Sequence, residues 1–183
     1  MKEKNILKQE MPYKDITSEL KKIATPNDNV IPVISKYLKY NIKNPSFDMK
    51  DIKDIERITL RQIQNIIGGQ FNLIHRVQEK GVRTPDVEYY NKLLHTNKRY
   101  YDVKAPKKSN SIKSKNCKIT HAFDQAKGQT KNIIISLLRD ECDLSNIEAV
   151  RQITNALNRP KYSWLNIVIL VGKNKFIKVY KRK

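Results

Sequence analysis

Apolar residues near the start of the chain recur with helical spacing. Ile16, Leu20 and Ile23 fall on one face of a helix over 13–24. A second short helix is predicted over 30–40, where Pro32 would stand in the first turn, a position that tolerates proline. Turn-forming residues follow both segments. We therefore expect residues 1–50 to form a helical N-terminal extension or a linker.

The longest helical stripe comes next, over 51–67, and Gly68-Gly69 marks its end. Beyond it, alternating or continuously apolar runs bounded by turn residues predict strands. Two further helices are predicted, and the second has Ser145 as N-cap with Glu148 completing a capping box. The expected strands are 71–77, 87–93, 99–105, 132–138, 165–171 and 175–181, and the expected helices are 119–128 and 145–157.

From residue 51 the predicted order is therefore α-β-β-β-α-β-α-β-β. That order is typical of a mixed central sheet flanked by helices, in the α/β (α+β) class. We expect residues 51–183 to form this domain.

The net charge of the chain indicates what kind of partner it binds. The chain of 183 residues has 37 Lys and Arg against 18 Asp and Glu, a net charge of +19. Residues 51–183 carry 27 basic and 12 acidic residues, which gives +15 of that excess. Such an excess favours a polyanion such as nucleic acid, through phosphate contacts and counterion release.

Other classes are disfavoured. The two cysteines, Cys117 and Cys142, have no metal-ligand spacing and form no disulfide framework, so a reducing compartment is expected. No apolar run approaches the length of a membrane span, and the first ten residues do not resemble a secretory signal. We expect a soluble protein with a cytoplasmic site of action.

Candidate chemistry lies on two adjacent predicted strands. Pro85-Asp86 precedes one strand, and Asp102-Val103-Lys104 lies on the next. Because side chains alternate along a strand, Asp102 and Lys104 should share one face while Val103 points to the other. Two carboxylates can hold a divalent cation, and a lysine beside them can orient water or stabilise charge on a phosphate.

In this order the residues resemble the PD-(D/E)XK nuclease superfamily. The closer similarity is to the nuclease domains at the C-termini of CdiA-type contact-dependent inhibition and related polymorphic toxins. It is carried by Thr84-Pro85-Asp86, by Asp102-Val103-Lys104 and by the segment from Gln125 to Leu137, which leads into an apolar strand. The resemblance covers roughly 51–183.

The resemblance implies hydrolysis of a phosphodiester bond, often in tRNA, with a divalent metal such as Mg²⁺. Asp86 and Asp102 would be metal ligands and Lys104 the catalytic lysine. Glu56 would be the helix carboxylate, with Glu79 and Glu88 as rivals, and Gln129, rather than Gln125, would match the helix glutamine. A toxin of this kind would be delivered as part of a larger secreted protein, and an acidic immunity protein would neutralise it.

Two further groups of residues could contact nucleic acid. The first consists of lysines that could follow a phosphate backbone. The second consists of tyrosines on the two strands, where alternate residues should be core and the outward ones could stack on unpaired bases. The lysines are Lys107, Lys108, Lys113, Lys115 and Lys118 in one loop, with Lys127 and Lys131 beyond it, and the tyrosines are Tyr89, Tyr90, Tyr100 and Tyr101.

Three alternatives stay open. One is a metal-independent RNase of the barnase, EndoU or RelE type, which would use His121, Lys104, Thr130 and Tyr101 with the 2′-hydroxyl of RNA. The others are a DNA endonuclease with the same site and a non-catalytic nucleic-acid-binding module. For His75, His95 and His121 a structural role is expected, because their spacing does not suit zinc.

Overall fold

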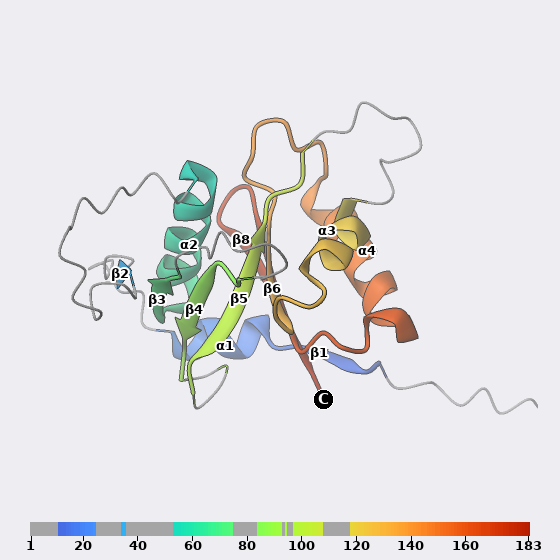
Figure 1. Cartoon of the computed structure of the whole chain (residues 1–183), viewed down its shortest axis with the longest axis horizontal. Coiled ribbons are helices and arrows are strands. Elements are labelled where there is room, and N and C mark those ends of the chain that lie inside the picture. Colours follow the sequence, from blue (N-terminus) through green and yellow to red (C-terminus); the bar gives the residue numbers. More distant parts are fainter. Residues whose placement is uncertain are drawn as a thin grey trace, which may run out of the picture.

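The computed structural model describes residues 11–24, 34–35, 53–74, 84–92, 94, 97–107 and 118–183 of the chain. Its strands form one mixed sheet in the order β1-β8-β7-β6-β5-β4-β3-β2 (Figure 1). The elements are β1 Tyr13–Asp15, α1 Thr17–Ile23, β2 Ile34–Ser35, α2 Asp54–Ile67, β3 Gln70–Leu73, β4 Val87–Tyr90, β5 Arg99–Lys104, α3 Lys118–Ala126, β6 Asn132–Ser136, α4 Asn146–Leu157, β7 Ile167–Gly172 and β8 Phe176–Arg182.

The order from α2 onward is the predicted α-β-β-β-α-β-α-β-β, and the fold class is confirmed. Strands β3, β4 and β5 form an antiparallel meander, and β6 then pairs with β5 in parallel. The parallel run continues into β7, and β8 returns antiparallel beside it. A sheet with both kinds of pairing results, in which β5 is the junction between the meander and the parallel part.

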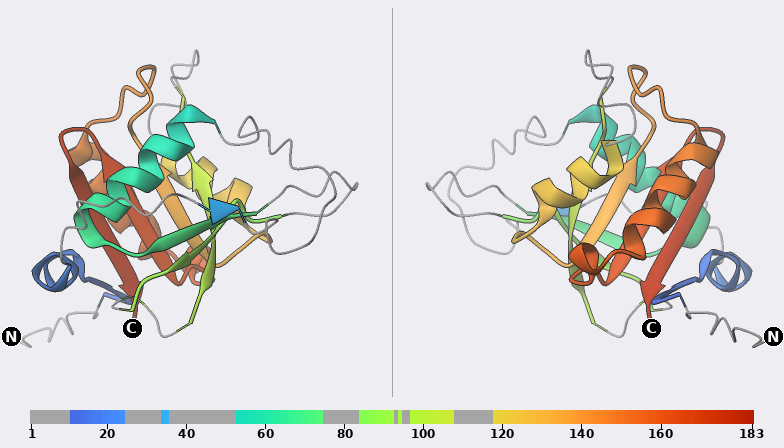
Figure 2. Two further views of the ribbon diagram at one scale, coloured as in Figure 1. Left: turned by 90° about the vertical axis from the view of Figure 1, so that its left-hand side faces the viewer. Right: turned by 90° about the vertical axis from the view of Figure 1, so that its right-hand side faces the viewer.

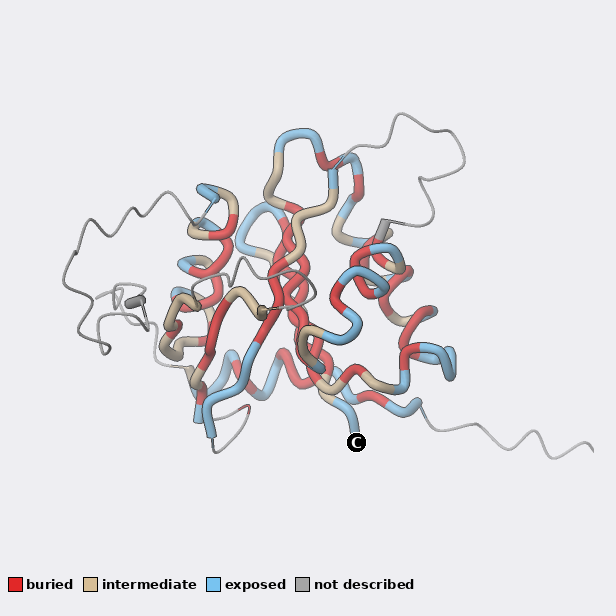
Figure 3. The backbone as a smooth tube through the Cα atoms, in the orientation of Figure 1, coloured by how far each residue is buried: buried red, intermediate tan, exposed pale blue. Residues whose placement is uncertain are grey.

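Helices cover both faces of the sheet, and each face has its own core (Figure 2). On one face α2 buries Leu60, Ile63 and Ile67 in the same cluster as Val103 and Ile134. On the other face α3 and α4 pack over the alternate residues of the same strands, such as Ile133 and Ile135. Burial therefore concentrates along the central strands and the helix faces turned toward them (Figure 3).

The N-terminal segment differs from its prediction. Tyr13–Asp15 is a strand that pairs with β8, and the helix expected from residue 13 begins only at Thr17. Ile16 and Leu20 are buried in the core on the α2 side of the sheet, so this segment packs as part of the sheet structure. Ile34–Ser35 is a short strand beside β3 where a helix was expected, and the rest of 30–40 lies outside the described residues.

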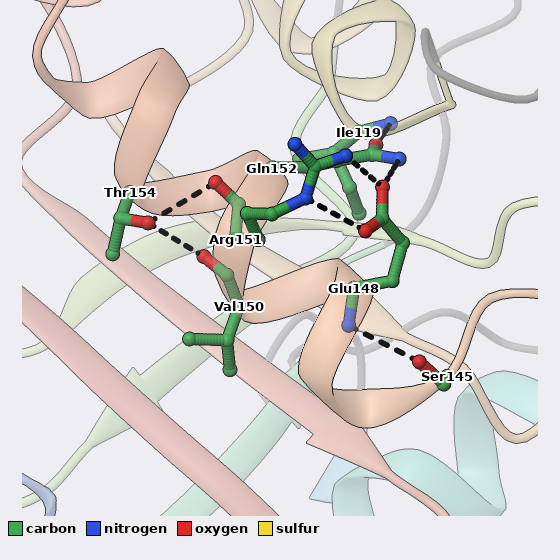
Figure 4. Close-up of polar contacts among 7 residues, drawn as sticks. All are labelled: Ile119, Ser145, Glu148, Val150, Arg151, Gln152 and Thr154. Atoms are coloured by element: carbon green, nitrogen blue, oxygen red, sulfur yellow. Dashed lines mark hydrogen bonds and ion pairs between the residues drawn. The ribbon is translucent and has the colours of Figure 1, made fainter.

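Polar contacts stabilise helix α4, and one of them reaches the start of α3 (Figure 4). Ser145 accepts a hydrogen bond from the Glu148 N–H, as expected for an N-cap. The Glu148 carboxylate, however, accepts from Arg151 and Gln152, so the structure shows it in a different role from the predicted capping box. The side-chain Oε1 of Gln152 accepts from the Ile119 N–H at 3.5 Å, and this contact connects α4 to α3.

None of the helices in the described part of the chain is long and apolar enough to cross a bilayer.

Candidate active site

Strand β5 presents different side chains to the two faces of the sheet. Tyr101 and Val103 are buried in the core beneath α2. Asp102 and Lys104 therefore point to the opposite face, as the alternation of a strand requires. The sequence prediction that these two residues share a face is consistent with this arrangement.

Asp86 lies beside Asp102 at the start of β4. Its backbone N–H donates to the Tyr101 carbonyl at 3.1 Å, and its Oδ2 accepts from the Val103 N–H at 2.8 Å. These two bonds continue the β4–β5 ladder by one residue and orient the carboxyl group. The Asp86 carboxyl group adjoins that of Asp102 and raises its pKa through a side-chain contact and through its charge.

Two further side chains complete the surroundings of Asp102, which is only 1% exposed. The Lys104 Nζ lies 2.7 Å from Asp102 Oδ2. With the Gln129 amide placed so that its nitrogen faces the carboxylate, it donates to Oδ2 at 2.8 Å and to Oδ1 at 3.3 Å. Gln125, the rival glutamine, instead contacts His121 on the same helix at 2.9 Å.

The turn between α3 and β6 positions Gln129. Gly128 ends the helix with a φ of 90°, a left-handed conformation that glycine adopts without steric cost. Beyond Gln129, Thr130 Oγ1 and Asn132 Nδ2 both donate to the Tyr100 carbonyl, at 2.6 and 2.9 Å. The turn is thus fastened to β5 two residues before Asp102.

The pKa of the Asp102 carboxyl is raised to about 7. Burial is the largest cause, and the hydrogen bond and negative charge of Asp86 raise it further. Lys104 lowers the pKa, but by less than the other contributions raise it. The Asp102 carboxyl group therefore favours its protonated form more than an aspartate in solvent does.

No protein-family model, curated protein or solved structure matches the chain.

A divalent cation fits the donor set around Asp102. The two carboxyl groups offer hard oxygen ligands that adjoin each other, and a cation would offset the negative charge that burial makes costly at Asp102. Among the described residues no group of three or more His, Cys, Asp or Glu side chains gathers closely enough to hold a metal. Asp86 and Asp102 are thus the two side chains that could hold the ion, with water and substrate oxygens as further ligands.

Glu56 is not gathered into such a cluster with the two aspartates. It lies in the first turn of α2, buried, where its Oε2 faces the Lys53 N–H at 3.4 Å. That contact gives a hydrogen-bond acceptor to a backbone N–H at the start of the helix. The sequence alone does not distinguish a glutamate in this capping role from one that binds a ligand. The rival Glu88 faces Asn72 and Lys98 on the meander, and the rival Glu79 lies outside the described residues.

The structure describes four of the seven lysines that were predicted to contact nucleic acid. Lys107, Lys127 and Lys131 are exposed, and the latter two flank the turn that carries Gln129. Lys118 begins α3. Lys108, Lys113 and Lys115 lie outside the described residues, as do His75 and His95.

The tyrosines divide as predicted. Tyr89 and Tyr101 are buried and meet edge to face with ring centroids 5.7 Å apart. Tyr90 is half-buried and Tyr100 is exposed.

One contributor was missed from the sequence. Asn132 is buried and fastens the α3–β6 turn to β5, yet it had been counted only as the first residue of an apolar strand. A buried asparagine that opens such a strand is a usable signal, because it needs hydrogen-bond partners.

Proposed function

We propose that this protein is a metal-dependent nuclease that hydrolyses phosphodiester bonds in RNA, with tRNA as the favoured substrate. The observation that carries the proposal is the buried Asp102 carboxyl group in contact with Asp86, Lys104 and Gln129. A carboxyl group with a pKa near 7, paired with a second one and a lysine, is costly to a fold and typical of functional sites.

The arrangement of the elements supports the same proposal. Helix α2, strands β3 to β5, helix α3 and strand β6 follow in the order on which the resemblance to PD-(D/E)XK nucleases was based. Asp86 precedes the middle strand of the meander, and Asp102 and Lys104 lie on its last strand. The spacing of the motif thus coincides with a spatial cluster, which a chance match of such a short motif would not require.

Each side chain then has a definite task. Asp86 and Asp102 would hold the divalent cation, which when bound supplies Lewis-acid charge at the scissile phosphate. Lys104, with its ammonium group already held at Asp102, would orient the attacking water and donate to an oxygen on which negative charge develops. Gln129 would fix the orientation of the Asp102 carboxylate.

The metal-independent RNase is supported less well. Tyr101, one of its four candidate residues, is buried on the face opposite Asp102 and Lys104. Thr130 donates its hydroxyl hydrogen to the Tyr100 carbonyl. Two of the four candidates therefore serve the packing and the turn. A toxin role, with delivery to the cytoplasm and an acidic immunity partner, belongs to the proposal through the resemblance alone.

Substitution at the site tests the proposal. With Mg²⁺ and purified tRNA, we expect Asp102→Ala and Lys104→Ala each to slow cleavage by roughly 100-fold or more, since each removes a group that acts in the transition state. Both variants should still bind tRNA in a filter assay within a few-fold of the wild-type affinity.

The matched controls are Glu19→Gln and Lys22→Ala, which change one acidic and one basic side chain exposed on α1. Both should cleave at the wild-type rate. Wild-type rates for Asp102→Ala and Lys104→Ala would contradict the proposed site.

A further inference from the structure

Tyr100 is a large aromatic side chain that the fold leaves partly exposed. It is 45% exposed, whereas its neighbour Tyr101 and its near neighbour Tyr89 are both fully buried. Exposing an aromatic ring forgoes the free energy that burial would gain. Tyr101 occupies the inward position, so the outward ring of Tyr100 is not needed for the core beneath α2.

The position of Tyr100 is defined by the site itself. It precedes Asp102 by two residues on β5 and so lies on the same face, about 7 Å away along the strand. That spacing is close to one nucleotide of an extended strand. The Tyr100 carbonyl accepts from Thr130 and Asn132, so the turn that brings Gln129 to Asp102 also fixes the backbone of Tyr100.

The charges around this face suit a polyanion. Tyr100, Asp102 and Lys104 follow one another on the same face of β5. Lys127 and Lys131 are exposed on the α3–β6 turn, which is hydrogen-bonded to the backbone of Tyr100. The one acidic residue opposite Tyr100 across the strand pair is Glu88, and Lys98 lies 3.5 Å from its carboxylate. A phosphate backbone on this face would meet Lys127 and Lys131, while Lys98 offsets the negative charge of Glu88 and Lys104 that of Asp102. The charge of Asp86 would be offset by the cation of the proposed function.

We propose that Tyr100 is a stacking platform for an unpaired base of the substrate, one nucleotide from the phosphate at Asp102. The inference rests on the proposed nuclease function and adds a substrate class, namely single-stranded or looped nucleic acid in preference to duplex. A base held within a duplex is already stacked on its neighbours and cannot turn toward the ring. Stacking is tolerant of sequence, since every base has an aromatic face.

The test measures binding without turnover. The full chain in EDTA is titrated into a short fluorescent RNA, either single-stranded or annealed to its complement, and a 2-aminopurine base reports stacking. We expect Tyr100→Ala to weaken single-strand binding roughly 5- to 100-fold and to abolish the 2-aminopurine quenching. Tyr100→Phe should retain both, because it keeps the ring.

The control is Ile147→Ala, which truncates an apolar side chain that is 84% exposed on α4. It should bind like the wild type, and the affinity for duplex should be the same in all four proteins. Unchanged single-strand binding by Tyr100→Ala in a protein that cleaves RNA would overturn this inference alone. Failure of the wild type to bind either RNA in EDTA would overturn this inference, and a wild type that also fails to cleave tRNA in Mg²⁺ would overturn the proposed function with it.

Discussion

Asp102 is the residue on which the proposed chemistry depends. Its carboxyl group is almost completely buried, adjoins a second carboxyl group, and receives one lysine and one glutamine. Burying an ionised carboxylate is costly unless it is paired, and here Lys104 pairs with Asp102 while the Asp86 carboxyl group adds negative charge. The cost is consistent with a site that gains its remaining positive charge from a cation.

The pKa of Asp102 predicts how stability depends on pH. Because the folded pKa, about 7, exceeds the unfolded value of 3.8, the folded state binds more protons between these values and stability falls as pH rises through that window. In EDTA we expect the free energy of unfolding to decrease by on the order of 2 kcal/mol between pH 5 and pH 8. Asp102→Asn should flatten this dependence, as measured by urea denaturation.

Glu19→Gln, on the exposed face of α1, should keep the wild-type profile. Adding Mg²⁺ at pH 8 should stabilise the wild type and leave Asp102→Asn unchanged. Parallel pH profiles for the wild type and Asp102→Asn would contradict the role given to this carboxyl group.

At this scale the sequence predicted much of the site. Strand alternation and the short separation of two strands predicted that Asp86, Asp102 and Lys104 lie together, whereas Gln129 was named only through the resemblance to PD-(D/E)XK nucleases. Glu56 was named too, but its carboxylate faces the start of its own helix. An acidic residue in a first helical turn is favourable there for electrostatic reasons alone, so its presence does not indicate a ligand.

Among the elements, the α3–β6 turn has the most direct effect on the site. Gly128 allows the chain to leave α3 in a left-handed conformation, Gln129 reaches Asp102, and Thr130 and Asn132 fasten the turn to β5. Helix α4 supports the other end of α3 through Gln152. The geometry around Asp102 is thus set by the ends of two elements as well as by the strands.

A pair of glycine substitutions tests this turn. Gly128 and Gly68 both follow a helix with positive φ. Alanine should cost about 1–2 kcal/mol of stability at Gly128, and about 1–3 kcal/mol at Gly68, whose ψ of −159° lies in a region that is nearly restricted to glycine. We expect only Gly128→Ala to slow tRNA cleavage markedly, about 10-fold, because relief of its strain moves Gln129. Equal rates for the two alanine variants, at matched stability, would show that the turn does not position the site.

The elements themselves were largely predictable from residue 51 onward, because their apolar periodicity is strong and their ends carry glycine or a cap. The N-terminal strand β1 was not. Tyr13–Asp15 is too short to show alternation, and its strand conformation depends on pairing with β8, more than 160 residues later in the chain. Pairing between segments so far apart in the chain cannot be recognised from the residues around Tyr13–Asp15 alone.

For the whole molecule, the net charge of +19 is the dominant property. It does not determine the fold, but it determines how a polyanion is attracted and how that attraction responds to salt. The exposed lysines on the α3–β6 turn lie beside the site, so part of this charge acts where the substrate would bind.

Salt dependence measures that contribution. If about four phosphates are neutralised on a single strand, the affinity should fall roughly 50-fold between 50 and 200 mM salt, measured by RNA titration in EDTA. Lys131→Ala should reduce the slope by roughly 0.7, the contribution of one phosphate. A slope near zero would contradict electrostatic binding of the backbone.

Metal removal tests the central claim most directly. Total tRNA and plasmid DNA are each incubated with the wild-type chain in Mg²⁺ and in EDTA, and the products are resolved on denaturing gels. We expect tRNA to be cleaved in Mg²⁺, with cleavage abolished by EDTA and restored by excess Mg²⁺. Cleavage of tRNA that persists in EDTA and leaves a 2′,3′-cyclic phosphate would contradict a metal-dependent site at Asp86 and Asp102.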